Sequence, residues 1–557
     1  MSRDDEMLDQ EAEQLTISSV FLDRVRQDGE QTALWFAVED QFQSITWNEL
    51  KIEVEQVARY LVSCGVTSGD RVVQLSENRR EWIVVDLAVL LIDAVHVPLH
   101  VSYGKSQIKW MVDHCGAIFA FASTEDQATK LMASQKLKQI VVYETPLKLV
   151  KSSKFRAYFD IETTNTADVD LTVEHSLPKA ESTASIVYTS GTTGHPKGVV
   201  LSHQNLMGNA SEVLSTYEVS QGIRRLVFLP LSHVYARTCD LYVWLLQGGE
   251  LMLARSRETI LDDCQSFHPT VINAVPYFYE KVVTRLKSSG KSEQPNILSQ
   301  TLGGQIRMCA CGGAALPDYV CNYFHTQDVP LYQGYGLTET SPVISTSRKD
   351  RSRLGSVGTV LPSVEVKIAE DGEIMTRSPY VMQGYYHDDD ATAEVIQDDW
   401  LHTGDLGYLD EEGFLFINGR KKDLAVTATG KNICPAQLEI LLTADPLIAQ
   451  AIIVCEGRKF VSALIVPDPE HLRAEIKRNR LWIFSKRGAL RHRKVIKWYQ
   501  QRITNALKDR ASYEQVQRFH LMDRGFTLET GEMTPKLSLK RNVIESNLKM
   551  QIEAMYC

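Results

Sequence analysis

The chain has 557 residues, 44% of them hydrophobic and 23% charged, which is typical of a globular protein with more than one domain. Its formal net charge of −10 excludes a protein that binds nucleic acid over its whole surface. Apart from Cys309 and Cys311 the ten cysteines are scattered singly, without zinc-ligand spacing, and no signal peptide is recognisable, which predicts reduced thiols in a cytoplasmic protein.

The N-terminal part alternates helical and strand patterns. Residues 1–16 are acidic, and we expect them to form a loose tail. From residue 17 to about 180, amphipathic stretches such as "WNELKIEVEQVARYLVSCG" alternate with β-rich runs such as "DRVVQLS", which predicts an α/β domain with parallel strands. The longest apolar stretch, residues 82–99, contains Asp86 and Asp93, so we interpret it as a buried helix leading into a strand and not as a membrane span.

The pattern changes towards the C-terminus. Residues 355–418 are β-rich and punctuated by Gly and Asp, which predicts hairpins that form a small barrel-like part. The charged junction "GRKKDL" (419–424) then separates a large N-terminal domain, residues 17–420, from a smaller α+β domain, residues 421–557. The predicted fold class is therefore α/β, with a multi-layer N-terminal domain rich in parallel strands and a smaller C-terminal domain.

A glycine-rich loop, residues 189–197, lies within the stretch "YTSGTTGHPKGVVLSH". Small residues let backbone N–H groups converge on an anion, hydroxyls add donors and a lysine adds charge. The loop is not the P-loop of kinase-like NTPases, because Pro196 replaces its second glycine and Gly198 follows Lys197 where a serine or threonine would bind magnesium. Taken alone, it is better explained as an ordinary glycine-rich turn.

Other segments change that interpretation. "YTSGTTGHPKGVVLSHQNL" resembles the phosphate loop of the adenylate-forming superfamily, which includes acyl-CoA synthetases, luciferases and the adenylation domains of peptide synthetases. Further segments resemble the same superfamily in the same order, namely "LVFLPLSHVYAR" (226–237), "GYGLTETSP" (334–342) and "WLHTGDLGYLDEEGFLFINGRKKDL" (400–424). With "ENRREW" and "GGAALP" the resemblance spans about residues 20–550, and the chain is identified as a member of this superfamily.

The resemblance implies a reaction in two steps. ATP and a carboxylate first form an acyl-adenylate and release pyrophosphate, and the thiol of coenzyme A then displaces AMP. Attack of one anion on another requires charge neutralisation and alignment. The family's phosphate site corresponds here to Thr189, Ser190, Gly191, Thr192, Thr193, Gly194 and Lys197. Thr338 would contact phosphate and Glu339 would hold Mg²⁺, although in isolation Glu339 is better explained as a surface or capping glutamate.

The resemblance also implies the rest of the nucleotide site. The backbone of Gly312, Gly313 and Ala314 and the ring of Tyr335 would enclose adenine, with Gln333, Gly334 and Gly336 beside it. Asp405 would accept hydrogen bonds from both ribose hydroxyls, and Arg420 would bind nearby. Without their neighbouring motifs, Tyr335, Asp405 and Arg420 would be interpreted as a core aromatic, a turn residue and a solvated arginine.

The acyl site is expected near His233, Val275 and Pro276. A histidine that bonds the backbone near a helix start is the alternative for His233. The Ser-His pair there is not a hydrolase signal, because the chain has no G-x-S-x-G elbow. Ala236 stands where long-chain enzymes have glutamate, and Tyr277 stands where they have arginine, so the preferred chain length stays open.

In this family the smaller domain is mobile and swings between the two half-reactions. The junction 420–423 corresponds to the hinge, with Lys422 at the pivot. The segment "TATGKNICP" (427–435) resembles the loop used for thioester formation, and we place Lys431 in the cofactor site. This segment carries Thr429 where long-chain enzymes usually have glycine.

The sequence departs from the family at the adenylation lysine. Long-chain enzymes typically read T-P-T-L-K-x-K-R near the C-terminus, whereas this chain reads "TPKLSLKR" (534–541), with Ser538 at the lysine position. If the segment is extended, residues two apart share a face at a spacing of about 6.5 Å, so Lys536 and Lys540 project with Ser538. We predict that Lys536 substitutes. The alternative is slow adenylation, or a protein that binds nucleotide and acyl groups without turnover.

Several segments, including "VMQGYYHDDDATAEV" and "ASYEQVQRFHLM", are most similar to long-chain fatty acyl-CoA synthetases. They predict a long-chain fatty acid:CoA ligase that uses ATP, Mg²⁺ and coenzyme A. A ligase for a medium-chain or aryl acid, or one that loads a carrier protein, is the alternative within the superfamily. The sequence has no signal for a particular oligomeric state.

A basic segment, residues 473–510, contains thirteen Lys or Arg and two acidic residues. Aromatic residues are interleaved with these charges, and apolar residues recur at helical spacing; they are Trp482, Phe484, Val495, Ile496, Trp498, Tyr499, Ile503 and Leu507. A solvated amphipathic helix is the simpler interpretation. The alternative is contact with an anionic membrane, such as the inner face of a cell membrane, or with the phosphates of CoA. Nucleic acid is disfavoured by the acidic chain.

Overall fold

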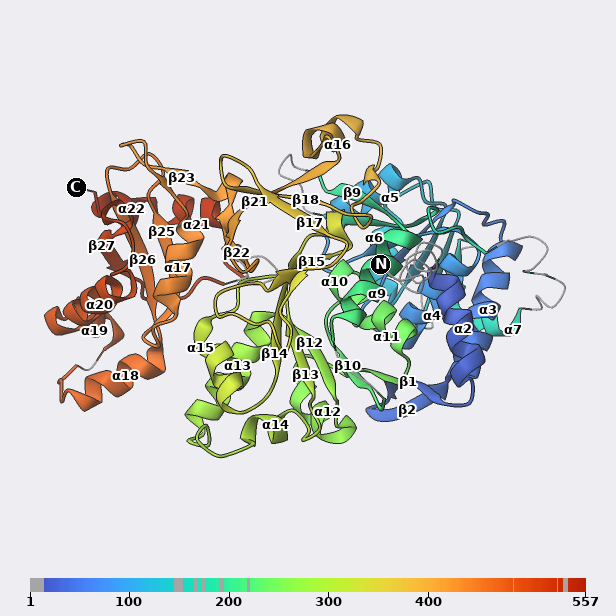
Figure 1. Cartoon of the computed structure of the whole chain (residues 1–557), viewed down its shortest axis with the longest axis horizontal. Helices are drawn as coiled ribbons and strands as arrows, with labels where there is room; N and C mark the ends of the chain where they lie inside the picture. Colours follow the sequence, from blue (N-terminus) through green and yellow to red (C-terminus); the bar gives the residue numbers. More distant parts are fainter. Residues whose placement is uncertain are drawn as a thin grey trace. The chain divides into compact units, whose positions relative to one another are not determined.

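The computed structural model describes residues 15–144, 154–164, 169, 171, 177–189, 195–217, 221–483, 485–527, 529–533 and 539–556. The chain divides into two compact units (Figure 1). The first comprises residues 1–367, 375–403 and 409–416, and the second comprises residues 368–374, 404–408 and 417–557. Among the described residues, no helix is long and apolar enough to cross a membrane.

An eight-stranded sheet forms one part of the first unit. Its order is β19-β9-β8-β4-β3-β5-β6-β7, and the strands from β4 to β7 pair in parallel. In chain order the strands are β3 (Arg71–Leu75), β4 (Val95–Leu99), β5 (Phe119–Ala122), β6 (Gln139–Val142), β7 (Phe155–Ala157), β8 (Thr183–Thr189), β9 (Lys197–Ser202) and β19 (Gly384–Tyr385).

A nine-stranded sheet, in the order β16-β15-β14-β13-β12-β10-β11-β1-β2, forms the other part. Its central pairs from β1 to β14 are parallel, and the pairs at both edges are antiparallel. The strands are β1 (Thr32–Val38), β2 (Gln41–Thr46), β10 (Arg224–Val227), β11 (Glu250–Leu253), β12 (Val271–Ala274), β13 (Met308–Cys311), β14 (Leu331–Gly336), β15 (Val343–Thr346) and β16 (Thr359–Val360).

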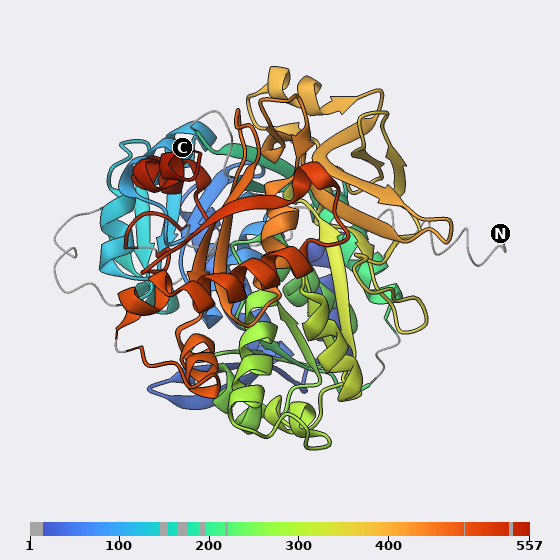
Figure 2. The same cartoon turned by 90° about the vertical axis from the view of Figure 1, so that its left-hand side faces the viewer.

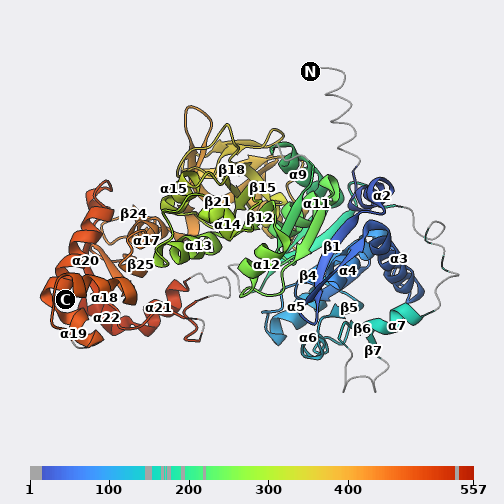
Figure 3. The same ribbon diagram turned by 90° about the horizontal axis from the view of Figure 1, so that it is seen from below.

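Helices cover both faces of each sheet, so the first unit has five layers. The central helical layer, buried between the sheets, contains α2 (Ile17–Asp28), α3 (Trp47–Ser63), α4 (Arg80–Leu91), α9 (His203–Ser215), α10 (Val234–Ala236), the π-helix η2 (Arg237–Tyr242) and α11 (Val243–Gln247). On the outer face of the eight-stranded sheet lie α5 (Lys105–Cys115) and α6 (Glu125–Leu131), opposite α3 and α4 (Figure 3). On the outer face of the nine-stranded sheet lie α12 (Ile260–Phe267), α13 (Pro276–Ser288), α14 (Ile297–Thr301) and α15 (Asp318–Thr326), while α7 (Tyr158–Thr163) packs on α3.

Successive side chains of a strand point to opposite faces of the sheet and therefore pack in different layers. Val72 packs in the central layer and Val73 in the outer one. Similarly, Phe121 faces inward and Ala122 outward. Because both faces are buried, the strands read as continuous apolar runs and not as alternating patterns. The predicted α/β architecture with parallel-rich sheets is confirmed.

Residues 82–99 form most of α4, a turn and β4, as predicted. Asp93, with φ at 55°, lies in the turn. Asp86 is fully buried in α4, where it forms an ion pair with Arg237 and accepts a hydrogen bond from Tyr242 at 3.2 Å, and His96 Nδ1 lies 2.8 Å from its Oδ1. Burial lowers the pKa of His96 to about 4, so this histidine is neutral. The negative charge of Asp86 is therefore compensated by Arg237 alone.

Arg237 links two elements of the first unit. It lies on η2, in the central helical layer, and is almost completely buried. Besides its ion pair with Asp86, its Nη1 donates to the Oγ of Ser185 on β8 at 2.6 Å. The helix that follows the "LSHVYAR" motif is thereby joined to the strand that enters the glycine-rich loop.

Between residues 365 and 420 the expected hairpins are present as parts of one five-stranded sheet. Its strands are β17 (Glu365–Ile368), β18 (Glu373–Arg377), β20 (Ile396–Gln397), β21 (Trp400–Leu409) and β22 (Leu415–Arg420), and α16 (Asp389–Val395) precedes β20. Within the described part of the chain, short 3₁₀ helices occur at η3 (Thr338–Thr340), η4 (Lys421–Asp423) and η5 (Ser512–Glu514).

The second unit is built on a three-stranded sheet with helices on both faces (Figure 2). The strands are β25 (Ile448–Val454), β26 (Val461–Pro467) and β27 (Val516–Leu521), with a separate pair β23 (Ala425–Val426) and β24 (Asn432–Ile433). One face holds α17 (Pro435–Thr443), α18 (Pro469–Arg478), α19 (Lys486–Arg491) and α20 (Arg493–Ala506), and the other holds α21 (Arg541–Asn547) and α22 (Lys549–Ala554). The smaller α+β domain is confirmed.

Candidate active site

The glycine-rich loop lies between two paired strands. β8 ends at Thr189 and β9 begins at Lys197, and these two residues are paired in antiparallel register. The predicted phosphate ligands Ser190, Gly191, Thr192, Thr193 and Gly194 lie outside the described residues. A Cβ on Gly198 would come within 2.9 Å of Ile186 and 3.2 Å of the Tyr188 ring, so the strand pair accepts only glycine there without displacement. That requirement explains why the serine or threonine of a P-loop is absent.

Lys197 and Glu339 are brought together through a tyrosine. The Lys197 ammonium lies 4.6 Å from the centroid of the Tyr385 ring, and the Tyr385 hydroxyl donates to Glu339 Oε1 at 2.9 Å. Burial raises the pKa of Tyr385 far above its usual range, so the hydroxyl remains a donor. Both predicted charged residues therefore contact the side chain of Tyr385, a residue that the sequence analysis did not identify. The only signal for it was the aromatic pair in "GYYHDDD".

Thr338 and Glu339 lie on η3, immediately after β14. A Cβ on Gly336 would lie 1.7 Å from the carbonyl oxygen of Pro342, so this sharp turn requires glycine. Leu337 N–H donates to Thr340 Oγ1 at 3.0 Å and fixes the start of the helix. The preceding predicted residues Gln333, Gly334 and Tyr335 are all half-buried on β14.

The predicted adenine wall meets the predicted acyl residues. A Cβ on Gly312 would lie 3.2 Å from the Tyr235 ring, and one on Gly313, whose φ is 82°, would lie 3.9 Å from Val275. Ala314 follows in the same turn, and Pro276 is the first residue of α13. Tyr235 is a second aromatic that the sequence did not identify as part of the site.

His233 has the structural role that was its alternative. It occupies the N-cap of α10, and its Nδ1 accepts a hydrogen bond from the Tyr235 backbone N–H at 3.3 Å. The histidine therefore orients the residue whose ring packs on Gly312. Ala236 is buried, and Tyr277 is about half exposed with its ring beneath Lys281.

The second unit holds the predicted ribose ligands. Asp405 on β21 is buried and pairs with Arg420 on β22, with 3.0 Å between Arg420 Nε and Asp405 Oδ1. The neighbouring Lys421 binds Asp371 at 2.6 Å and Glu373 at 3.0 Å, and Glu373 also accepts from the Gly404 N–H. The predicted pivot Lys422 is exposed on η4.

Thr429 braces the loop in which it replaces glycine. Its hydroxyl bonds the hydroxyl of buried Thr427 at 2.9 Å, and the Lys431 N–H donates to Thr427 Oγ1 at 3.0 Å. The ammonium of Lys431 lies 5.6 Å from the centroid of the Tyr513 ring. The substitution therefore adds a hydrogen bond within the loop.

The C-terminal lysine segment is bounded by a fixed frame. Lys536 and Ser538 lie outside the described residues. Met533 and Leu539, the described residues on either side of this segment, form an antiparallel bridge. The Lys540 N–H donates to the Glu532 carbonyl at 2.8 Å.

Glu532 holds this frame. Its side chain is fully buried and binds Arg524 through both oxygens at 2.6 and 2.7 Å, with further hydrogen bonds from Asn547 at 3.1 Å and Thr530 at 2.8 Å. These bonds, that of Arg524 first, lower the pKa of Glu532 from 4.5 to about 2. The carboxylate is therefore charged at all ordinary pH values.

Replacing Glu532 with glutamine is expected to lower the free energy of unfolding by about 2 kcal/mol at pH 7, because a charged hydrogen-bonded acceptor is lost. A carboxyl with a lowered folded-state pKa stabilises above its ordinary pKa, and that contribution disappears as pH falls from 4.5 towards about 2. Urea unfolding between pH 7 and pH 3 measures both effects. Glu553→Gln, in the surface pair with Arg458, is the matched control and should change stability much less. Equal effects of the two variants would contradict the prediction.

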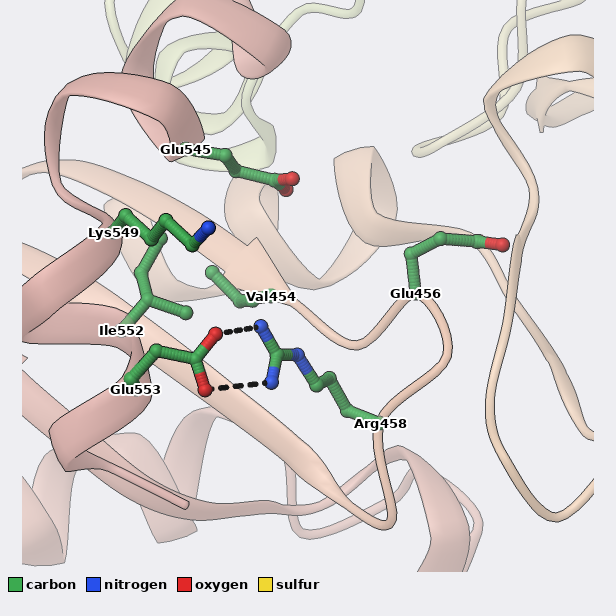
Figure 4. Close-up of a pocket in the computed structure, with 7 residues that line it drawn as sticks. All are labelled: Val454, Glu456, Arg458, Glu545, Lys549, Ile552 and Glu553. Carbon is green, nitrogen blue, oxygen red and sulfur yellow. Dashed lines mark hydrogen bonds and ion pairs between the residues drawn. The ribbon is translucent and has the colours of Figure 1, made fainter. Parts of the chain in front are cut away.

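A separate pocket of about 250 Å³ lies in the second unit (Figure 4). It is lined by Val454, Glu456, Arg458, Glu545, Lys549, Ile552 and Glu553, of which Arg458 and Glu553 form a two-bond ion pair. None of the predicted site residues lines it. Its three carboxylates outnumber its two cations, so it is poorly suited to the phosphates of ATP or CoA.

The donor set fits Mg²⁺ delivered with a nucleotide. Within the described part of the chain, no group of three or more His, Cys, Asp or Glu side chains could hold a metal ion by itself. Mg²⁺ is commonly bound by one or two carboxylates together with substrate phosphates and water. Glu339, which like Lys197 contacts Tyr385, is a single carboxylate of the kind that such a site needs.

The fold places the protein in a structural class. The anthranilate CoA ligase AuaEII in complex with anthranoyl-AMP superposes with a TM-score of 0.79 at 19% identity, over 97% of this chain and 98% of that one. The adenylation domain of a carboxylate reductase from Mycobacterium chelonae gives 0.78 at 20% identity, over 97% and 91%. The fold is therefore the two-domain α/β fold of adenylate-forming enzymes.

The sequence gives the family. The pattern of the AMP-binding enzyme family matches residues 21–386, and that of the AMP-binding enzyme C-terminal domain matches residues 422–557. The chain belongs to the AMP-binding enzyme family. It is 31% identical to the long-chain-fatty-acid–CoA ligase FadD15 of Mycobacterium tuberculosis, over 97% of both chains. It is 25% identical to the human long-chain-fatty-acid–CoA ligase ACSBG2, over 97% and 92%. The 2-succinylbenzoate–CoA ligase of Bacillus cereus is 31% identical over 75% of this chain and 82% of its own.

Proposed function

We propose that the protein is an AMP-forming long-chain fatty acid:CoA ligase that uses ATP, Mg²⁺ and coenzyme A. The observation that carries the proposal is the convergence of Lys197 and Glu339 on Tyr385, next to the glycine-rich loop. A cation and a magnesium-binding carboxylate at one position suit a triphosphate. The long-chain substrate is supported by the names of the relatives FadD15 and ACSBG2, whereas 2-succinylbenzoate–CoA ligase supports an aryl acid as the alternative.

In this proposal, the chain's own groups neutralise and align the reactants. Lys197 pairs with the phosphate that leaves, and Glu339 and Thr338 hold the nucleotide with its metal. Mg²⁺, when bound, supplies further neutralisation of the phosphate charge. The turn at Gly312 and Gly313 presents backbone to adenine on one side and packs on Tyr235 and Val275 on the other. The acyl chain is then expected beside Tyr235.

The second unit is proposed to contribute the ribose and thioester contacts. Asp405, held by Arg420, has the paired oxygens that two ribose hydroxyls require. We assign the hinge to residues 420–423 with Lys422 at its centre, the large domain to residues 17–420 and the small one to 421–557. The braced loop that contains Thr429 and Lys431 is assigned to the CoA step.

A panel of acids tests the function. Pyrophosphate release from ATP is measured with palmitate, a medium-chain acid, benzoate and 2-succinylbenzoate, first without and then with CoA. Release that is highest with palmitate, followed by palmitoyl-CoA formation, is the expected result. A preference for an aryl acid would overturn the substrate assignment. Absence of release with every acid would overturn the enzyme assignment and favour a nucleotide-binding protein.

We also propose peripheral contact with an anionic membrane, on its cytoplasmic side, through the basic segment. Trp482 is 87% exposed between α18 and α19, and nine Lys or Arg between residues 477 and 497 are all exposed. Val495, Tyr499 and Ile503 of α20 are buried, as is Leu507 directly after it, whereas Ile496 is 39% exposed. Tryptophan favours the membrane interface, and each cation near an anionic surface contributes about 1 kcal/mol.

Charge reversal tests this contact. The variant Arg487→Glu/Arg491→Glu is expected to bind vesicles with 30% phosphatidylglycerol at least about 30-fold more weakly than the wild type, since two attractive charges become repulsive. Co-sedimentation at 50 and 300 mM salt measures binding. The matched control Arg257→Glu/Lys281→Glu reverses two charges on the first unit and should not change it. Binding that is insensitive to salt and to the reversal would contradict membrane contact by this segment.

A further inference from the structure

Three rings surround Trp110, a half-buried residue of α5. The indole stacks on the His195 imidazole, with 4.8 Å between ring centroids and an angle of 8° between the planes. It also stacks on His114, at 4.5 Å and 16°. The ring of Tyr188 meets it edge-on at 6.1 Å and 79°.

Two of these rings flank the glycine-rich loop. Tyr188 is the penultimate residue of β8, and His195 stands two residues before β9. The strands are paired at Tyr188 with Gly198 and at Thr189 with Lys197. One side chain of α5 therefore contacts the residues on both sides of the segment 190–194, which sequence similarity assigns to phosphate.

The two ends are not held equally. Tyr188 is bonded to α5 twice, since its hydroxyl donates to the Met111 carbonyl at 3.2 Å and lies 2.8 Å from His114 Nδ1. A hydroxyl has one proton to donate, so Nδ1–H of His114 must be the donor to Tyr188. Burial lowers the pKa of His114 and raises that of Tyr188, which keeps both groups neutral. His195, by contrast, is joined to α5 by the stack on Trp110.

A second set of contacts lies beyond His195. Lys197 rests on the Tyr385 ring, and the next residue, Tyr386, donates its N–H to the Gly198 carbonyl at 2.7 Å. The ring of Tyr386 lies 5.7 Å from His114. The stack on Trp110 and the Lys197–Tyr385–Glu339 contacts therefore belong to one connected layer around the end of the loop.

We propose that Trp110 is a positioning residue that fixes the exit of the glycine-rich loop through His195 and thereby sets the affinity for the phosphates of ATP. The inference rests on the proposed function, because it assumes that the loop binds ATP. Trp110 itself does not contact the nucleotide in this account. Its effect is expected on ATP and not on the acid or on CoA.

Kinetics and equilibrium binding test the proposal together. Trp110→Ala is expected to raise the KM for ATP about 5- to 10-fold, the range of one aromatic stacking interaction, without changing the KM for palmitate or CoA. Trp110→Phe retains a ring and should recover most of the loss. His195→Ala should reproduce the effect. The double variant should add little to either single variant, because each substitution removes the same stack between Trp110 and His195. Equilibrium dialysis with ATP and Mg²⁺ gives the affinity independently of turnover.

The outcomes separate the inference from the proposed function. If the wild type binds ATP and Trp110→Ala binds it equally well, the inference is overturned while the ligase assignment stands. Equal increases in KM for ATP and palmitate would also overturn it, since they indicate general disruption. Should Trp110→Ala fail to fold, the variant of the exposed His195 is used instead. An unchanged ATP affinity in His195→Ala contradicts the inference. ATP binding without pyrophosphate release would instead contradict the ligase assignment.

Discussion

Replacing Lys536 with alanine is expected to slow acyl-adenylate formation about 100-fold, while the reaction of preformed palmitoyl-AMP with CoA keeps its rate. The developing charge on the α-phosphate needs a cation, and removal of one such stabilising group typically costs a factor of 10² to 10³. Lys536 is our candidate because, by the resemblance to long-chain enzymes, Ser538 occupies the position expected for the adenylation lysine. Single-turnover pyrophosphate release and thioester formation measure the two steps separately.

The substitution Ser538→Lys in the Lys536→Ala background sharpens the test. If Lys536 replaces the family's lysine, the double variant should regain most of the adenylation rate. Lys549→Ala, an exposed lysine on α22 of the same unit, is the matched control and should behave as the wild type. A Lys536→Ala variant with full adenylation activity would refute the assignment. It would leave Lys540 as the next candidate.

Glu339→Gln should lower kcat about 100-fold and raise the concentration of Mg²⁺ needed for half-maximal activity. Glutamine keeps the shape of the side chain and can still accept the hydrogen bond from Tyr385, but it lacks the charge that a hard cation requires. The fold should therefore persist while the metal contact weakens. Titration of pyrophosphate release with Mg²⁺, at fixed ATP, measures the change.

Two further variants show whether the effect comes from the lost charge of Glu339 at this position. Tyr385→Phe removes the hydroxyl but keeps the ring beneath Lys197, so its effect should be much smaller than that of Glu339→Gln. Glu258→Gln, on the exposed surface of the first unit, controls for loss of one negative charge. An unchanged Mg²⁺ requirement in Glu339→Gln would show that the metal is held elsewhere.

Local patterns in the sequence were sufficient for most of the fold. The apolar run at residues 82–99 indicated a buried helix and strand, and α4 and β4 confirm it. The two-residue period at Val72 and Val73 serves two different cores, which is why these strands show no polar face. The charged junction near residue 420 was visible because no apolar pattern crosses it.

The site was only partly predictable. Motif residues such as Asp405 and Arg420 could be assigned to neighbouring parts of one site, and the structure places Arg420 Nε 3.0 Å from Asp405 Oδ1. The aromatic residues Trp110, Tyr235 and Tyr385 were missed, since an aromatic at regular spacing is indistinguishable from a core residue until its partner is known. The partners that tie these rings to the site lie far away in sequence, for example Glu339 for Tyr385 and His195 for Trp110.

The buried Arg237 has a consequence for altering substrate preference. Its guanidinium bonds Ser185, four residues before the end of β8, and its helix continues from the segment that contains Tyr235. A larger or smaller residue at Tyr235 is therefore expected to affect both the turn at Gly312 and the strand that leads to Thr189. Tailoring the protein to other acids is consequently expected to require paired substitutions on η2 and β8, because Arg237 joins these two elements.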